Sequence, residues 1–109
     1  MAIRYTMKDL SIIVCQCDIE WESPLRNCSK LEAMLDRAIR DVEEGGGGNP
    51  AQNVDLVILP EFFSMGFTMS RDAAISEGGS TLKWMKEFAV SRGVALYGSV
   101  PTISIDSGD

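Results

Sequence analysis

A single carboxylate, Glu61, stands where a buried strand is predicted to end. Residues 56–59 before it form a short, continuous apolar run, which is typical of a strand buried on both faces of a parallel sheet. Pro60 lacks a backbone N–H and should end the strand, so Glu61 is expected at the strand's carboxyl end, the edge of α/β sheets where ligands bind. A carboxylate crowded by Phe62 and Phe63 would favour its neutral form and act as a better base. The alternative is a loop glutamate that points into water.

The segments around this strand predict an alternation of strands and helices. β-branched and apolar residues predict further strands over residues 10–16 and 94–100. Between residues 31 and 42 the apolar positions follow the i, i+3, i+4, i+7 pattern of an amphipathic helix. A second helix is predicted over residues 81–92, ended by Gly93.

This order predicts a parallel α/β sheet with right-handed crossovers. If the three strands add in one direction, both helices cover the same face and the other face is left bare, although the strands are apolar on both sides. Either the strand order reverses, as in a small flavodoxin-like unit, or another layer covers the bare face.

The connecting segments carry weaker signals. Residues 1–6 show no pattern and are interpreted as an extension. The glycines at 45–48 follow a helix, so they are expected to form a flexible return and not a phosphate-binding loop. Residues 64–79 are read as a loop that either lines a pocket or packs as a lid. Residues 101–109 are expected to begin the next connection.

Composition excludes several classes of function. The chain has 109 residues, enough for one small domain, and its apolar fraction of 45% allows a real core. A net charge of −6 without a basic cluster argues against nucleic acid as a partner. No stretch predicts a membrane span or a signal peptide, so no membrane partner is expected and the default location is cytoplasmic.

The sequence has few residues that could bind a metal through sulfur or nitrogen. The sequence contains no histidine, which removes Ser-His and Cys-His relays and imidazole zinc sites. Cys15 and Cys17 share one face of the first predicted strand and could hold a metal, but buried thiols that fill space are the preferred interpretation. We therefore expect no metal and no cofactor.

The segment around Glu61 resembles a known protein family. The run Leu59-Pro60-Glu61, followed by Phe63 and Gly66-Phe67, resembles the first catalytic segment of the nitrilase superfamily, the carbon–nitrogen hydrolases, and more narrowly the bacterial omega-amidase branch. Further matches follow the family's order along the chain: Trp21, Asn27 and Gly98-Ser99.

The resemblance implies a fold. The superfamily forms an α-β-β-α sandwich, of which residues 1–109 would be the βαβαβ N-terminal part, with three mainly parallel strands and two helices and with the C-terminal half absent. It also implies a homo-oligomer or association through an exposed sheet face.

The resemblance also implies a reaction. A family member would hydrolyse the terminal amide of a short carboxylic or 2-oxo acid amide and release ammonia, with Glu61 as the catalytic general base and Phe67 as a substrate-binding residue. The family's cysteine nucleophile and lysine have no match here. Cys15, Cys17 and Cys28 lie in or near the first strand and helix, and Lys83 and Lys86 fall on a helix that matches a non-catalytic element. The chain alone is therefore expected to be inactive. The alternative is a small, non-catalytic α/β binding or interaction module.

Overall fold

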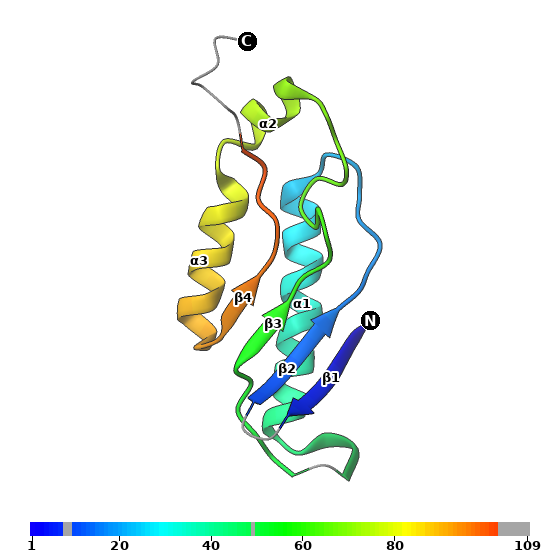
Figure 1. Cartoon of the computed structure of the whole chain (residues 1–109), viewed down its shortest axis with the longest axis vertical. Helices are drawn as coiled ribbons and strands as arrows, with labels where there is room; N and C mark the ends of the chain where they lie inside the picture. Colours follow the sequence, from blue (N-terminus) through cyan, green and yellow to red (C-terminus); the bar gives the residue numbers. More distant parts are fainter. Residues whose placement is uncertain (8–9, 49, 103–109) are drawn as a thin grey trace.

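The computed structural model describes residues 1–7, 10–48 and 50–102 as one mixed α/β unit (Figure 1). Its elements, in chain order, are β1 (Ala2–Met7), β2 (Leu10–Cys15), α1 (Pro24–Glu43), the short 3₁₀ turn η1 (Gly46–Gly48), β3 (Leu56–Ile58), α2 (Arg71–Glu77), α3 (Ser80–Arg92) and β4 (Ala95–Tyr97). The three strands and two helices predicted from the sequence are all present.

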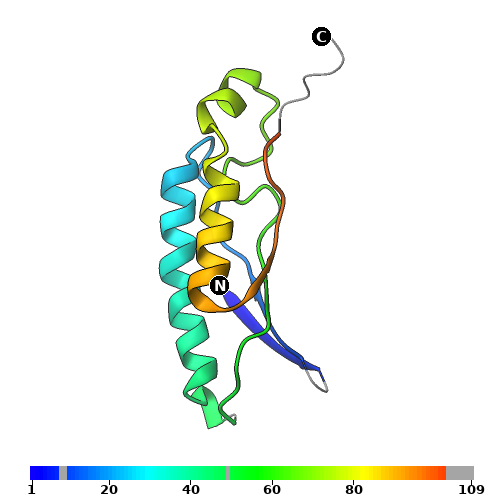
Figure 2. The same ribbon diagram turned by 90° about the vertical axis from the view of Figure 1, so that its left-hand side faces the viewer.

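The sheet has the strand order β1-β2-β3-β4. β2, β3 and β4 are parallel, with Val14 opposite Ile58 and Ile58 opposite Tyr97. Because these strands add in one direction, α1 and α3 lie on the same face of the sheet (Figure 2). The reversed, flavodoxin-like order is therefore wrong.

The first residues form β1, which pairs antiparallel with β2 at the edge of the sheet. The sequence predicts only an extension here. The hydrogen bonds that stabilise β1 come from β2, and no pattern within residues 1–6 indicates that this pairing will form.

The core lies between the sheet and the two long helices. The helix-facing residues of the strands, such as Ile13 and Val57, are buried, and so are Leu31 and Leu35 from the predicted stripe of α1. Arg92 of α3 joins the helices through a bidentate contact with Asp36, with Nε–Oδ1 and Nη2–Oδ2 distances of 2.9 and 2.8 Å. The helix pair is thereby fixed over the sheet.

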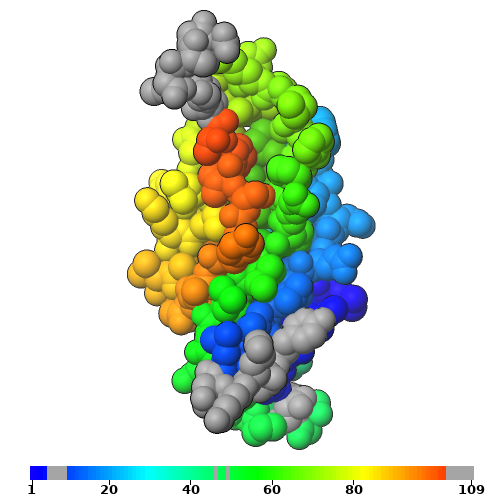
Figure 3. Space-filling model, in the orientation of Figure 1, coloured from blue at the N-terminus to red at the C-terminus, as the bar shows by residue number. Residues whose placement is uncertain are grey.

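The opposite face of the sheet is uncovered by any described residue. Figure 3 looks onto this face, where β2, β3 and β4 lie side by side at the surface. Its side chains are mostly apolar and only partly buried, with Tyr97 71% exposed. We call this set the bare sheet face: Ile12, Val14, Leu56, Ile58 and Tyr97.

The segment predicted as one long loop, residues 64–79, contains the helix α2. Ser70 caps its start by accepting a hydrogen bond from the Ala73 N–H at 3.1 Å, and Gly78 ends it with φ 62°. The predicted connection over residues 101–109 lies outside the described residues except for 101 and 102. In the described ranges, no helix is long and apolar enough to span a membrane.

Candidate functional site

Glu61 lies at the carboxyl edge of the sheet, as predicted. β3 ends at Ile58, and Leu59 still donates its N–H to the Tyr97 carbonyl at 2.9 Å before Pro60 turns the chain away. Residues 61–65 then form a turn, which we call the site loop together with Gly66. The Glu61 side chain is exposed. No hydrogen bond or ion pair engages it within the described part of the chain.

The residue after Glu61 has an unusual backbone. Phe62 has φ 52°, a left-handed conformation that costs a non-glycine residue about 1 kcal/mol. Its N–H donates to the Ser99 hydroxyl at 2.8 Å, and its carbonyl accepts from the Gly66 N–H at 2.8 Å. These two bonds hold the conformation, and they fix where the neighbouring Glu61 side chain leaves the backbone.

Asn27 of α1 ties the site loop to the rest of the fold. Its side chain is fully buried and makes three hydrogen bonds. The Nδ2 group donates to the Ser64 carbonyl at 2.6 Å and to the Glu20 carbonyl at 2.7 Å, while Oδ1 accepts from the Glu20 N–H at 2.8 Å. A buried amide that satisfies three backbone groups at once makes displacement of the loop costly.

The Ser64 side chain is held from a second direction. Thr81 of α3 donates to the Ser64 hydroxyl at 2.8 Å, and both residues are buried. The buried Glu77 carboxylate in turn accepts the N–H groups of Gly79 and Thr81 at 2.7 Å, which satisfies free donors at the start of α3. The site loop is therefore anchored to both long helices.

Trp21 covers the end of the site loop. A Cβ atom at Gly66 would lie 3.1 Å from the Trp21 ring, and Gly66 has φ 77°. Next to Trp21, the Glu22 N–H donates to the Met65 carbonyl at 2.8 Å. A larger residue here would strain the backbone and press on the Trp21 ring, which favours glycine at this position.

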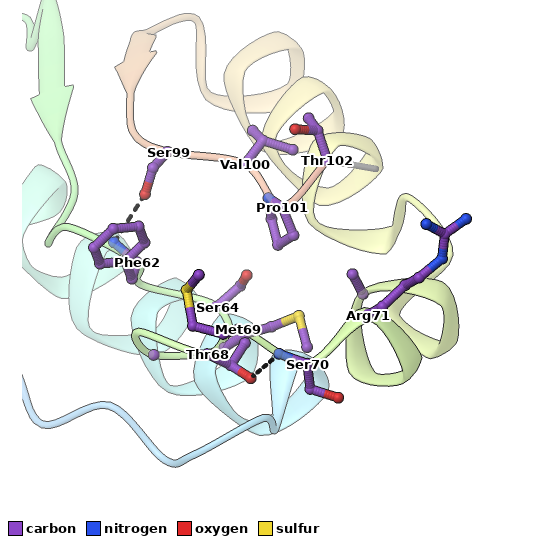
Figure 4. A pocket seen from close by; sticks show the side chains of 13 residues that line it. Phe62, Ser64, Thr68, Met69, Ser70, Arg71, Ser99, Val100, Pro101 and Thr102 are labelled. Atoms are coloured by element: carbon purple, nitrogen blue, oxygen red, sulfur yellow. Dashed lines mark hydrogen bonds between the residues drawn. The ribbon is translucent and has the colours of Figure 1, made fainter. Parts of the chain in front are cut away.

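A cavity of about 480 Å³ opens beside the site loop (Figure 4). Its wall is largely apolar, with hydroxyl groups between the apolar side chains. In Figure 4, Phe62 and Met69 face Val100 and Pro101 across the cavity, and the guanidinium of Arg71 points away from it. The described residues that line it are Phe62, Ser64, Met65, Gly66, Thr68, Met69, Ser70, Arg71, Ala74, Ser99, Val100, Pro101 and Thr102.

The two site residues named from the sequence lie next to this cavity but do not line it. Glu61 directly precedes Phe62, which forms part of the wall. Phe67 is 65% exposed and packs edge-to-face on the Phe62 ring, with the ring centroids 5.0 Å apart. The expected crowding of Glu61 by both phenylalanines is not found, because Phe63 is buried in the core against Trp84.

The comparison with protein families decides the identity. The model for the carbon–nitrogen hydrolases matches residues 12–106, which is most of the chain. This chain belongs to the carbon–nitrogen hydrolase family. No curated protein and no solved structure shows significant similarity to it.

In this carbon–nitrogen hydrolase chain, the cysteines and lysines do not join Glu61. Burial raises the pKa of both Cys15 and Cys28 to about 11, so these thiols hold their protons at neutral pH. Lys83 and Lys86 are exposed on α3 and border a different surface hollow. None of these residues lines the cavity.

Sequence reasoning missed the buried polar contacts that position the site loop. Asn27 matched the family without a stated role, and its side chain bridges Glu20 and Ser64. Gly98-Ser99 matched the family without a stated role. A Cβ atom at Gly98 would lie 3.0 Å from the Phe63 ring, and Ser99 receives the Phe62 N–H.

Replacing Asn27 with aspartate tests this anchoring. The variant keeps the shape of the side chain but puts a carboxylate oxygen against the Ser64 and Glu20 carbonyls. We expect Asn27→Asp to lower the free energy of unfolding by about 3 kcal/mol or more, because a buried charge loses two donated hydrogen bonds. Urea unfolding measures this.

The matched control is Asn53→Asp, at an exposed position of the loop before β3. It should change the free energy of unfolding by less than about 0.5 kcal/mol. Equal effects of the two variants would contradict the anchoring role of Asn27.

Proposed function

We propose that this chain provides the general base and part of the substrate pocket of an amidase. The reaction is hydrolysis of the terminal amide of a short carboxylic or 2-oxo acid amide with release of ammonia, as in the omega-amidase branch. The observation that carries the proposal is the position of Glu61: an exposed carboxylate at the carboxyl edge of a parallel sheet, one residue before the wall of a cavity of about 480 Å³.

The chemistry assigns Glu61 the proton transfers of both half-reactions. As general base it takes the proton of a thiol nucleophile, and the thiolate attacks the amide carbon to form a tetrahedral intermediate. The proton then passes to the leaving nitrogen, ammonia departs and a thioester remains. Water then attacks the thioester with the same carboxylate as base, the carboxylic acid product forms, and the proton returns to the thiolate that leaves. An exposed side chain on a rigid loop suits a group that must reach both thiol and water.

Phe67 is assigned a part in substrate binding through Phe62. The edge-to-face contact between the two rings holds the Phe62 ring against the cavity. Cytoplasmic placement is part of the same proposal, and the three free cysteines support a reducing compartment.

A binding experiment tests the pocket. Addition of a short 2-oxo acid amide to the ¹⁵N-labelled chain should shift the amide resonances of Phe62, Ser64 and Thr68. Phe67→Ala should weaken the binding about threefold to tenfold, the effect of losing one aromatic pair. Tyr97→Ala, which removes an exposed ring from the bare sheet face, is the matched control and should leave the affinity unchanged. Shifts confined to other regions would overturn the pocket assignment.

An activity assay tests whether any cysteine or lysine of this chain takes part in the reaction. With the same amide, we expect the 109-residue chain to release ammonia at the buffer rate, and Glu61→Gln to give the same rate, because no cysteine or lysine among the described residues is placed for the reaction. Ammonia release that Glu61→Gln abolishes would show that the chain already holds a nucleophile. That result would overturn this part of the proposal.

The bare sheet face supports a second proposal, association with another copy of the chain. Two copies of this face would bury Val14, Ile58 and Tyr97 from water, which is the main driving force for such interfaces. This surface is also the observation that favours the alternative function, a non-catalytic interaction module.

A pair of valine substitutions tests the association. Val14→Lys puts a charge on the bare sheet face, whereas Val90→Lys puts the same charge on α3 at a valine that is 85% exposed. Light scattering over a range of concentrations should show assembly of the wild type and Val90→Lys, and a shift of Val14→Lys toward the monomer. A wild-type chain that stays monomeric at all concentrations would contradict the proposal.

A further inference from the structure

Three sulfur atoms meet on the helix-facing side of the sheet, at the end of β2. Cys15 is the last residue of β2, and Cys17 lies two residues on. The Cys15 Sγ is 3.4 Å from the thioether sulfur of Met34 in α1. Burial raises the pKa of the Cys15 thiol, and the Cys17 thiol lies close enough to Cys15 to raise that pKa further. α1 thus adds a third sulfur to a pair that the sequence alone could show.

Two thiols and one thioether form a distinctly soft donor set. Thiolate and thioether ligands favour Cu(I) and similar thiophilic ions, whereas structural zinc prefers four nitrogen or sulfur ligands. Among the described residues, no group of three His, Cys, Asp or Glu side chains could hold a metal ion. The sulfur set is distinct from such groups because its third member is methionine.

The contact between Cys15 and Met34 requires little rearrangement to bind an ion. Three sulfurs at about 2.3 Å from one ion lie roughly 4 Å from one another in a trigonal plane. Cys15 and Met34, at 3.4 Å, would have to separate by a few tenths of an ångström. Met34 is unbranched, and its thioether can shift by rotation about its side-chain bonds.

Access also fits an ion that enters from solvent. Cys15 is 3% exposed, but Cys17 is only partly buried and opens the cluster to solvent. Each thiol must lose its proton for the metal to bind.

We propose that Cys15, Cys17 and Met34 form a binding site for one Cu(I) ion. Binding forms two Cu–thiolate bonds and one Cu–thioether bond, and it releases the two thiol protons to solvent without any change of oxidation state. The site belongs to the end of β2 and to α1, and it does not depend on Glu61 or on the amidase proposal.

A competition titration of the anaerobic, reduced chain tests the site. Cu(I) is transferred from a coloured Cu(I) chelator, and the loss of colour gives the stoichiometry and the affinity. We expect one tightly held Cu(I) per chain. Cys15→Ser and Cys17→Ser should each weaken binding by more than about tenfold, and Met34→Leu should weaken it measurably.

Cys28→Ser is the matched control, because Cys28 is a buried thiol in α1 outside the cluster. It should leave the affinity unchanged. A loss with Cys28→Ser equal to that with Cys15→Ser would mean non-specific thiol binding and would overturn the proposal.

A second measurement on the wild-type chain avoids any folding defect of the variants. Ag(I), a diamagnetic ion with the same preference for sulfur, should shift the ¹³C-methyl resonance of Met34 and leave that of Met85 in α3 in place. A Met34 methyl resonance that does not move at one equivalent of Ag(I) would exclude the thioether as a ligand.

Discussion

One buried side-chain amide, that of Asn27, connects the parts of this structure that form the candidate site. It joins the segment after β2, the first turn of α1 and the site loop through three hydrogen bonds, each to a backbone group. A backbone carbonyl such as that of Ser64 has no ladder partner once the chain leaves the sheet, so it needs a donor from elsewhere. Asn27 supplies that donor from α1. Thr81 and Ser99 then add contacts from α3 and from the segment after β4. The position of Glu61 therefore depends on the packing of both helices.

The two faces of the sheet differ in how far they are covered by other parts of the chain. Toward α1 and α3 the strands are covered, and Val57 at the centre is fully buried. On the bare sheet face, residues of the same apolar type are only partly buried. Such a surface is unfavourable in water, and this is the basis of the proposal that another apolar layer covers it. The sandwich implied by the family resemblance has a second sheet in this position, and the proposed association of two copies would serve the same physical need.

Much of this arrangement follows from the sequence, because it depends on local periodicity. The apolar stripe predicted α1, and Gly93 predicted the end of α3. Pro60 predicted the end of β3 and therefore the position of Glu61. α2 was not predicted, because a helix of seven residues is too short to show an apolar stripe, although Ser70 and Gly78 are valid start and stop signals. β1 was not predicted, because this strand depends on pairing with β2 and not on a pattern of its own. The Asn27–Ser64 and Cys15–Met34 contacts join residues 37 and 19 positions apart, and no local pattern encodes such pairs.

The central claim is that Asn27 holds the site loop, and amide hydrogen exchange tests it most directly. In the wild type, the N–H groups of Phe62 and Gly66 donate to Ser99 and to Phe62. They should therefore exchange slowly. In Asn27→Asp, both amides should lose more protection than those of β2 and β3, because the loop loses its anchor in addition to the overall loss of stability. Protection of Phe62 and Gly66 that is the same in both proteins would contradict the account.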